Sequence, residues 1–397
     1  MRVTVEPARD LLARLGNPEQ GLRVVHVAGT KGKGSVAALV AGSLEYAGLR
    51  TGVFASPHVE RINERIRIGG AEIEDDELAV VLKAALDAQE AARDEGTAGR
   101  DASWFDVLTA AAVLAFRRAE VDWAIVECGL GGRLDSTNAL SGEVCVITNI
   151  DLEHTDVLGE TLAEIASEKA GILDAGSTLV TSVGPTTEAG AVIETRAKKV
   201  GVPILRPELA GLSILEENAE LARCVLAELG RRGVRGGGGK ALDLTVPESV
   251  LAASRLPGRL EVREVDGVRV ILDGAHVASS LERVLGDLER AELLSGAPLV
   301  CILGVGKDKQ LEALLKVLVE RVDRLVCTTV GMGPVRSPRE IQEVAADLRL
   351  AAETAVGPRG ALKRALELAG PDGVVLVTGS LHLIGAVRPL LLPTKTC

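Results

Sequence analysis

Hydrophobic residues in this chain fall into short, continuous runs that are separated by longer stretches with a helical pattern. Continuous runs, unlike alternating ones, indicate strands that are covered on both faces of a sheet. The Ala/Leu/Glu-rich stretches between them indicate helices, so the pattern predicts parallel, doubly wound α/β sheets. The predicted strands lie at 24–27, 51–55, 123–127, 144–148, 178–181, 268–272, 299–303, 324–328 and 374–378.

The strand-helix units form two series, which predicts two domains. A chain of 397 residues exceeds what one ordinary hydrophobic core organises. Between the two series lies the stretch 231–240, whose four consecutive glycines predict a flexible surface loop. A fresh series of strands begins in the region 256–266. We therefore expect a first domain at 1–256 and a smaller one at 257–397.

Composition narrows the class of protein. The net charge of -11 argues against nucleic acid as the main partner, because no basic excess is available to neutralise phosphates. No uncharged apolar run is long enough to cross a bilayer, and the first residues carry charges throughout, so we expect a cytoplasmic protein without a membrane segment. The six cysteines are scattered without a CxxC pair, so we expect neither a disulfide framework nor a structural zinc site.

The sharpest motif is a glycine-rich turn, GTKGKGS at 29–35, between a predicted strand and a predicted helix at 36–46. Backbone N–H groups and the positive end of a helix meet at such a turn, which suits a phosphate chain. Lys33 would reach the β- and γ-phosphates, and Ser35 could help to order a magnesium ion. Gly34 separates these two residues, so the strict Walker pattern is not met. A nucleotide-free turn in a Rossmann-like unit is the alternative, which the full combination disfavours.

Two further residues suggest a metal site. Glu127 ends a buried strand and precedes the turn 129–132, at the edge of a parallel sheet where ligands bind. Mg²⁺ prefers oxygen ligands, which favours Glu127 as a ligand over a carboxylate that only caps the turn. His154 follows the strand at 144–148 and lies beside two carboxylates. A lone histidine is more often structural, so the residues alone leave its role open.

Motifs along almost the whole chain carry a family resemblance, in the family's order. The chain resembles the folylpolyglutamate synthase/dihydrofolate synthase family of the Mur ligase superfamily. The matching segments are LGNP at 15–18, HVAGTKGKGS at 26–35, SPH at 56–58, NERIRI at 63–68, FDVLTAAAVLAF at 105–116, VECGLGGRLDSTN at 126–138, ITNIDLEHTDVLG at 147–159, SEKAGI at 167–172, PGR at 257–259, DGAH at 273–276 and TGSLHLIGAVR at 378–388.

The resemblance implies an architecture and a reaction. The first domain would be a P-loop NTPase-like sheet that binds ATP, and the second a smaller Rossmann-like glutamate-ligase domain. The enzyme would form an acyl phosphate on a pterin-type acid and then join L-glutamate to it. Its partners would be ATP, L-glutamate and the acid, and the protein would be a monomer. The sequence leaves open whether one chain makes both dihydrofolate and longer folylpolyglutamates.

The resemblance also assigns residues. Two Mg²⁺ ions would be held by Ser56, Glu127 and His154, and Lys169 would be carbamylated. The catalytic set would be Lys33, Lys169, Glu127 and His154. The remaining residues implied are those that bind ATP (Gly29, Thr30, Lys31, Gly32, Lys33, Gly34, Ser35, Asn218, Arg259 and Asp273) and those that contact substrate (Phe105, Asp106, His276 and Lys307).

Some positions depart from the family's pattern. Val277 and Ala278 stand where the family has Asn-Pro, His382 replaces a tyrosine, and Ile62 replaces an aromatic residue. These changes leave the ATP and metal residues intact but put the identity of the acid in question. One alternative is therefore a Mur-type amide ligase for a non-pterin acid. A second is a nucleotide-binding regulatory protein without ligase activity, against which the retained lysines and Glu127 argue.

Overall fold

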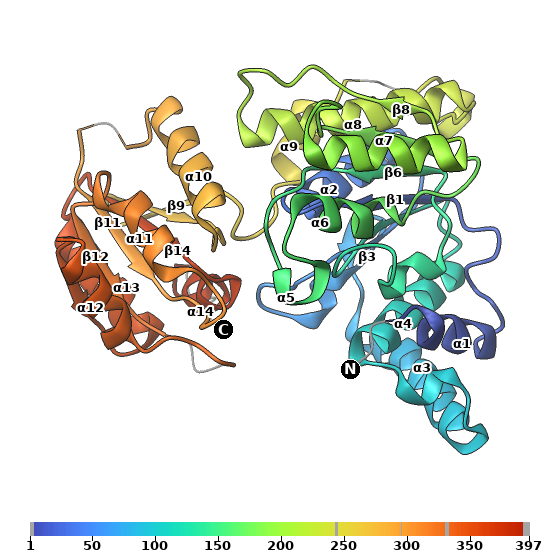
Figure 1. Ribbon diagram of the computed structural model, residues 1–397, viewed down its shortest axis with the longest axis horizontal. Helices are drawn as coiled ribbons and strands as arrows, with labels where there is room; N and C mark the ends of the chain where they lie inside the picture. The colour runs from blue at the N-terminus through green and yellow to red at the C-terminus, as the bar shows by residue number, and fades with distance from the viewer. Residues whose placement is uncertain (1–3, 243–244, 295, 330–332, 392–397) are drawn as a thin grey trace. The chain divides into compact units, whose positions relative to one another are not determined.

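The computed structural model describes residues 4–242, 245–294, 296–329 and 333–391. The chain divides into two compact units, Met1–Ser254 and Arg255–Cys397, coloured blue to yellow and yellow to red in Figure 1. This division falls two residues before the predicted boundary between 256 and 257. We call them unit 1 and unit 2 and describe each by itself.

Unit 1 is built on one eight-stranded sheet with the order β4-β3-β2-β5-β1-β6-β7-β8. The six neighbouring strands β2, β5, β1, β6, β7 and β8 pair in parallel. At one edge of the sheet, β3 pairs antiparallel with β2, and β4 pairs antiparallel with β3. The strands are β1 (Val24–Ala28), β2 (Thr51–Phe54), β3 (Ile66–Ile68), β4 (Ala71–Glu72), β5 (Trp123–Glu127), β6 (Val144–Ile147), β7 (Thr178–Thr181) and β8 (Ile204–Leu205).

Helices cover both faces of this sheet, as the continuous apolar runs predicted. Val25 and Val27 of β1 pack in a core with α2, α8 and α9, while Val24 packs in another core with α1, α3 and α4. A third core joins β6 and β7 to α6 and α7. These helices are α1 (Glu6–Arg14), α2 (Lys33–Tyr46), α3 (Asp75–Glu95), α4 (Trp104–Arg118), α6 (Leu162–Ala170), α7 (Glu188–Val200), α8 (Ile214–Arg231) and α9 (Glu248–Ala253).

Unit 2 contains a second sheet, of six strands, with the order β13-β12-β11-β14-β10-β9. All neighbours are parallel except β9, which pairs antiparallel with β10. Its strands are β9 (Glu261–Val265), β10 (Val268–Leu272), β11 (Leu299–Leu303), β12 (Arg324–Cys327), β13 (Ala352–Thr354) and β14 (Val374–Thr378), and its helices are α10 (Ala278–Arg290), α11 (Leu311–Val319), α12 (Pro338–Asp347), α13 (Gly357–Ala369) and α14 (Leu381–Leu391). The predicted α/β class with two largely parallel sheets is confirmed.

The glycine run was predicted to be a flexible surface loop, and the structure adds a specific contact. Gly237 N donates to Ala47 O at 2.7 Å, directly after α2. A Cβ on Gly236 would lie 2.5 Å from the same Ala47 oxygen, so this approach requires glycine. Across the described ranges, no helix has the length and apolarity needed to span a bilayer.

Candidate active site

The turn between β1 and α2 has the geometry of a phosphate-binding loop. Gly29 and Gly32 take φ values of 139° and 82°, which strain other residues. A Cβ at Gly29 would lie 1.9 Å from Thr148 Oγ1, and one at Gly32 would lie 2.5 Å from Asn218 Oδ1. The loop therefore winds closely past two neighbouring segments before α2 begins at Lys33. Its backbone and the N-terminus of α2 can bind an anion, as the sequence predicted.

Glu127 lies beside this loop because β5 pairs with both β1 and β2. Its Oε1 is 3.9 Å from Lys33 Nζ, and its Oε2 accepts a hydrogen bond from Ser56 N at 3.0 Å. The side chain is only 5% exposed. The structure thus brings together three residues that the sequence predicted for the nucleotide and the metal.

The set Ser56, Glu127 and His154 stays a prediction as a group of metal ligands. Mg²⁺ in nucleotide sites commonly takes one or two carboxylates besides phosphates and water, and Glu127 meets that requirement. In the parts of the chain that the structure describes, no group of three or more His, Cys, Asp or Glu side chains is placed to hold a metal. His154 is exposed and begins the short helix α5 (Thr155–Leu158) with a left-handed φ of 52°.

Lys169 reaches the phosphate-binding loop from α6. It is 4% exposed, and its Nζ donates to Gly29 O at 2.7 Å. Burial and the nearby charge of Lys33 lower the pKa of Lys169 to about 7. A large fraction of the side chain is therefore a neutral amine near neutral pH, which is the form that reacts with electrophiles.

Asn218 also reaches the loop, as the resemblance implied. It lies on α8, is 6% exposed, and packs its Oδ1 against the backbone of Gly32. The neighbouring segment after β6 holds the loop from another side, since Thr30 N donates to Asn149 O at 2.9 Å. Four segments far apart in the sequence, which contain Gly32, Glu127, Asn149 and Asn218, therefore meet at one loop.

Phe105 and Asp106, both predicted to contact substrate, lie in the first turn of α4. Phe105 packs against the turn after Glu127, where a Cβ on Gly129 would come within 2.5 Å of its ring. Asp106 closes the helix cap instead of facing outward. One of its oxygens accepts hydrogen bonds from Ser103 N and Oγ, and the other from Ser136 Oγ at 2.6 Å. A substrate role for Asp106 stays a prediction, and the observed role is structural.

Sequence reasoning missed Arg65 and Trp104. The Arg65 guanidinium lies 4.7 Å from the centre of the Trp104 ring and donates from Nε to His58 Nδ1 at 2.8 Å. Burial lowers the pKa of Arg65, whereas the negative charge of Glu127 raises it. Trp104 is 57% exposed, although it is one of the chain's few aromatic residues. The sequence offered no specific signal for this pair, because Arg65 is one of two arginines in the segment 63–68 and lies far from Trp104 in the chain.

A buried polar network lies beneath the turn after β5. His26 Nε2 is 2.9 Å from Thr137 Oγ1, and Asp135 Oδ2 accepts a hydrogen bond from Leu130 N at 2.7 Å. Burial lowers the pKa of His26 to about 4, so the imidazole is neutral. Burial also raises the pKa of Cys128, which contacts His26. This cysteine is therefore a protonated core residue and not a nucleophile.

In unit 2, three predicted residues gather at the end of β10. The Asp273 oxygens accept hydrogen bonds from Leu260 N and Ala275 N, both at 2.9 Å. Arg259 NH1 would lie 2.7 Å from a Cβ on Gly274, and His276 Nδ1 is 2.9 Å from Gly274 O. Arg259, Asp273 and His276 are therefore neighbours.

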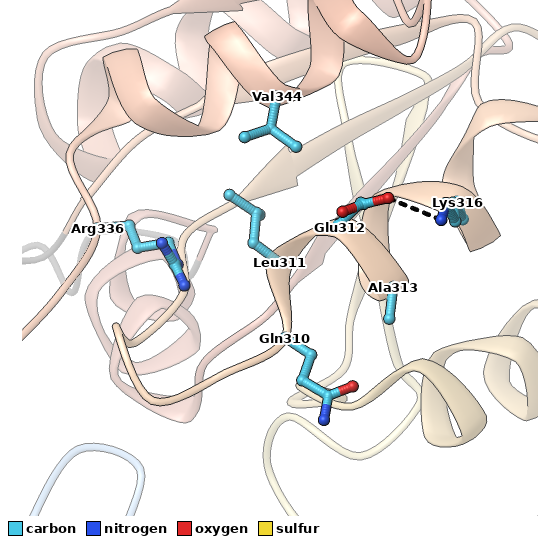
Figure 2. A pocket seen from close by; sticks show the side chains of 7 residues that line it. All are labelled: Gln310, Leu311, Glu312, Ala313, Lys316, Arg336 and Val344. Carbon is cyan, nitrogen blue, oxygen red and sulfur yellow. Dashed lines mark ion pairs between the residues drawn. The ribbon is translucent and has the colours of Figure 1, made fainter.

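Lys307, the fourth predicted residue of unit 2, lies in the loop after β11. Its backbone N donates to Pro334 O at 2.9 Å, and Arg336 donates to Lys307 O at 3.3 Å. Figure 2 shows Arg336 at one side of a cavity of about 500 Å³ beside α11. The other cation at this cavity, Lys316, is paired with Glu312 at 2.7 Å. We assign Arg336 a structural role, in which it fixes the loop that carries Lys307.

Comparison with known proteins supports the resemblance. Residues 258–381 match the family model "Mur ligase, glutamate ligase domain". The dihydrofolate synthase/folylpolyglutamate synthase of Bacillus subtilis is 31% identical, over 96% of this chain and 94% of that protein. A probable bifunctional folylpolyglutamate synthase/dihydropteroate synthase of Haloferax volcanii is 33% identical over 96% of this chain. This chain spans only 48% of that longer protein.

Solved structures agree with these relatives. E. coli FolC in complex with DHPP and ADP matches with a TM-score of 0.83 and 26% identity, over 98% of this chain and 93% of that chain. A bifunctional folylpolyglutamate synthase/dihydrofolate synthase with Mn, AMPPNP and L-glutamate bound matches with a TM-score of 0.81 and 26% identity, over 98% and 95% of the two chains. The chain thus belongs to the folylpolyglutamate synthase/dihydrofolate synthase family, and it is an ATP-dependent ligase.

Proposed function

We propose that this chain joins L-glutamate to a pterin-type acid through an acyl phosphate made from ATP. The observation that carries the proposal is the position of Glu127, which lies 3.9 Å from Lys33 beside the phosphate-binding loop and precedes the turn at Gly129 against which Phe105 packs. Nucleotide, metal and acid sites would thus share one edge of the sheet of unit 1. Relatives bound to ADP, DHPP and L-glutamate support this choice of substrates.

The first step transfers the γ-phosphoryl group of ATP to the carboxylate of the acid, and ADP leaves. Backbone N–H groups of the loop and the ammonium of Lys33 bind the phosphates and offset the charge that builds on them. Glu127, with Ser56 and His154, would hold Mg²⁺, which neutralises phosphate charge when it is bound. The number of ions remains a prediction.

We propose that Lys169 is carbamylated. The neutral amine of Lys169 attacks carbon dioxide, an N–C bond forms, and one proton leaves, so that the side chain becomes an anion. Burial beside Gly29 O supports this step because the lowered pKa, about 7, supplies the unprotonated amine. A carbamate would add negative charge where Lys31 and Lys33 gather, and it would offer oxygen atoms to a divalent cation.

The flat ring of the acid would lie near Trp104 and Phe105. Flat rings bind by stacking and apolar contact. The rings of Trp104 and Phe105 are arranged edge to face, with 80° between their planes and 6.1 Å between their centroids. Arg65 backs Trp104 and brings a positive charge to this surface. The departures Val277 and His382 belong to unit 2, whereas these rings belong to unit 1.

The second step forms the amide. The amino group of L-glutamate attacks the acyl carbon, the C–N bond forms, and the C–O bond to phosphate breaks, so that inorganic phosphate leaves. The residues that we propose for nucleotide and substrate in unit 2 are Arg259, Asp273, His276 and Lys307. Their grouping at the ends of β10 and β11 supports this, because ligands bind at the carboxyl ends of parallel strands.

The test is ADP release by the purified protein with MgATP, L-glutamate and either 7,8-dihydropteroate or tetrahydrofolate. We expect release only when glutamate and an acid are both present, and a product whose mass equals acid plus glutamate minus water. The acid that works decides whether one chain has both activities. Nucleotide binding without release for either acid would contradict the pterin substrate and favour another carboxylic acid.

Trp104→Ala should sharpen the test of the acid site. Loss of the exposed ring should raise the KM for the acid up to about tenfold, with the KM for ATP unchanged. Tyr46→Ala is the matched control, because Tyr46 is also an exposed aromatic, at 62%, but lies at the end of α2. Equal KM values for the acid in Trp104→Ala and the parent would remove this ring from the proposed site.

A further inference from the structure

The phosphate-binding loop carries two lysines with different partners. Lys33 Nζ donates to Thr30 O at 3.3 Å and lies near Glu127. Lys31 Nζ instead forms an ion pair with Glu153 Oε1 at 2.8 Å. The side chain of Glu153 is only 10% exposed and that of Lys31 is 30% exposed. An ion pair that is this well shielded from water is worth more than a surface pair, because solvent screens it less.

The backbone of Lys31 is bound to the same segment as its side chain. Lys31 N donates to Asn149 Oδ1 at 2.9 Å, and Lys31 O accepts hydrogen bonds from Thr148 Oγ1 and Asn149 Nδ2, at 2.6 and 3.2 Å. Next to it, Thr30 Oγ1 accepts a hydrogen bond from Asp151 N at 3.0 Å. The segment 148–153 is therefore fastened to the loop at several points, and Lys31–Glu153 is the last of them before His154.

His154 needs such support. Its φ of 52° is in the left-handed region, which costs a residue other than glycine about 1–2 kcal/mol. A backbone of this kind persists when its surroundings determine it. Glu153, the residue directly before it, is held by Lys31, so the ion pair fixes the approach of the chain to His154.

We infer that Lys31 is a positioning residue, whose ion pair with Glu153 holds the segment that carries His154 against the phosphate-binding loop, and that it is not a second phosphate ligand like Lys33. This inference rests on the proposed ATP and metal site. Its consequence is a division of labour within one loop. Lys33 acts on the nucleotide, and Lys31 acts on the placement of His154.

The test compares Glu153→Gln and Lys31→Met by two measurements. The first is the Mg²⁺ concentration for half-maximal activity, which should rise about tenfold or more in both variants, as for residues that orient metal ligands. The second is calorimetric binding of ADP in EDTA, which should change less than about threefold in both because no phosphate contact is lost. Lys33→Met is the reference for a phosphate contact and should weaken that metal-free binding about tenfold or more.

A double-mutant cycle separates the pair from its members. The variant Lys31→Met/Glu153→Gln should need no more Mg²⁺ than either single variant, because the one interaction is already lost. Lys31→Arg keeps the charge and should restore most of the Mg²⁺ dependence. Glu160→Gln removes an exposed carboxylate from the same stretch of chain and serves as the matched control.

Two results would overturn the inference. Either Lys31→Met weakens ADP binding in EDTA as much as Lys33→Met does, or Glu153→Gln leaves the Mg²⁺ dependence unchanged. Failure of the proposed function is a separate outcome, in which the parent protein binds MgADP but ligates no glutamate. The Mg²⁺ titration is then made on nucleotide binding, and the same two variants still decide the role of Lys31.

Discussion

Glu127 in unit 1 and Asp273 in unit 2 occupy equivalent places, each at the end of a buried parallel strand, yet their surroundings differ. Glu127 accepts a backbone N–H from Ser56 and lies near the ammonium of Lys33. Asp273 accepts backbone N–H groups with both oxygens, from Leu260 and Ala275. The position at a strand end is thus the same for both carboxylates, but that of Asp273 also fixes the turn next to Arg259.

The strongest way to break this comparison is Glu127→Gln. The amide keeps the shape and can still accept from Ser56 N, but it loses the charge that faces Lys33 and a metal. We expect kcat to fall about a hundredfold or more. The temperature of unfolding should change by no more than about 4 °C. Steady-state kinetics and calorimetry check this, and an active variant would contradict the role of Glu127.

Asp273→Asn should have a smaller effect on rate and a larger one on stability. One of the two backbone donors, Leu260 N or Ala275 N, would face an NH₂ group and lose its acceptor, which costs about 1–3 kcal/mol of unfolding free energy. We expect kcat to fall about tenfold, through misplacement of Arg259. If denaturant unfolding were unchanged while kcat collapsed as in Glu127→Gln, the hydrogen bonds of Asp273 to the turn would not contribute to stability.

A third effect is a pH dependence of stability that unit 1 owes to Lys169. The pKa of Lys169 is lowered from 10.5 to about 7, so between these values the unfolded chain binds a proton that the folded chain does not. The free energy of unfolding should therefore rise with pH across that interval, by up to about 1.4 kcal/mol per pH unit. It falls as the pH drops towards the folded pKa.

Denaturant titrations of the parent and of Lys169→Met, in buffer free of carbon dioxide, measure this effect. The variant should lack the rise, because methionine carries no proton to release. Adding bicarbonate at the alkaline end should increase the activity of the parent only, since the neutral amine is then abundant. Identical pH profiles of stability for the two proteins would show that Lys169 titrates normally.

Local patterns were enough to predict part of the site. The phosphate-binding loop and Glu127 could be found because a strand, a turn and the next helix are adjacent in sequence. Lys169 and Asn218 were placed only by resemblance, because their contacts with Gly29 and Gly32 depend on how α6 and α8 pack. The pairing of Arg65 with Trp104 was missed because no spacing rule joins the end of the short 3-10 helix Ile62–Arg65 to the start of a distant helix.

Two residue types have local roles that the sequence analysis did not name. Asp106 was predicted to contact substrate, which stays a prediction, and its carboxylate also accepts hydrogen bonds from Ser103 and Ser136. Acidic residues three positions after a serine often close a helix cap, and that signal was present in the sequence. The four glycines were predicted to form a flexible surface loop, and two of them, Gly236 and Gly237, also contact the backbone of Ala47. In both cases the structure adds a local backbone contact that the sequence analysis did not name.

The close approach of Asn218 to Gly32 brings α8 to the phosphate-binding loop. A Cβ on Gly32 would lie 2.5 Å from Asn218 Oδ1, so a side chain at position 32 would collide with this helix. The other end of that helix is anchored through Glu228, which is paired with Arg231 and Arg232 and bonded to Thr178 of β7. The helix α8 therefore connects the phosphate-binding loop, through Asn218, with strand β7, through Glu228.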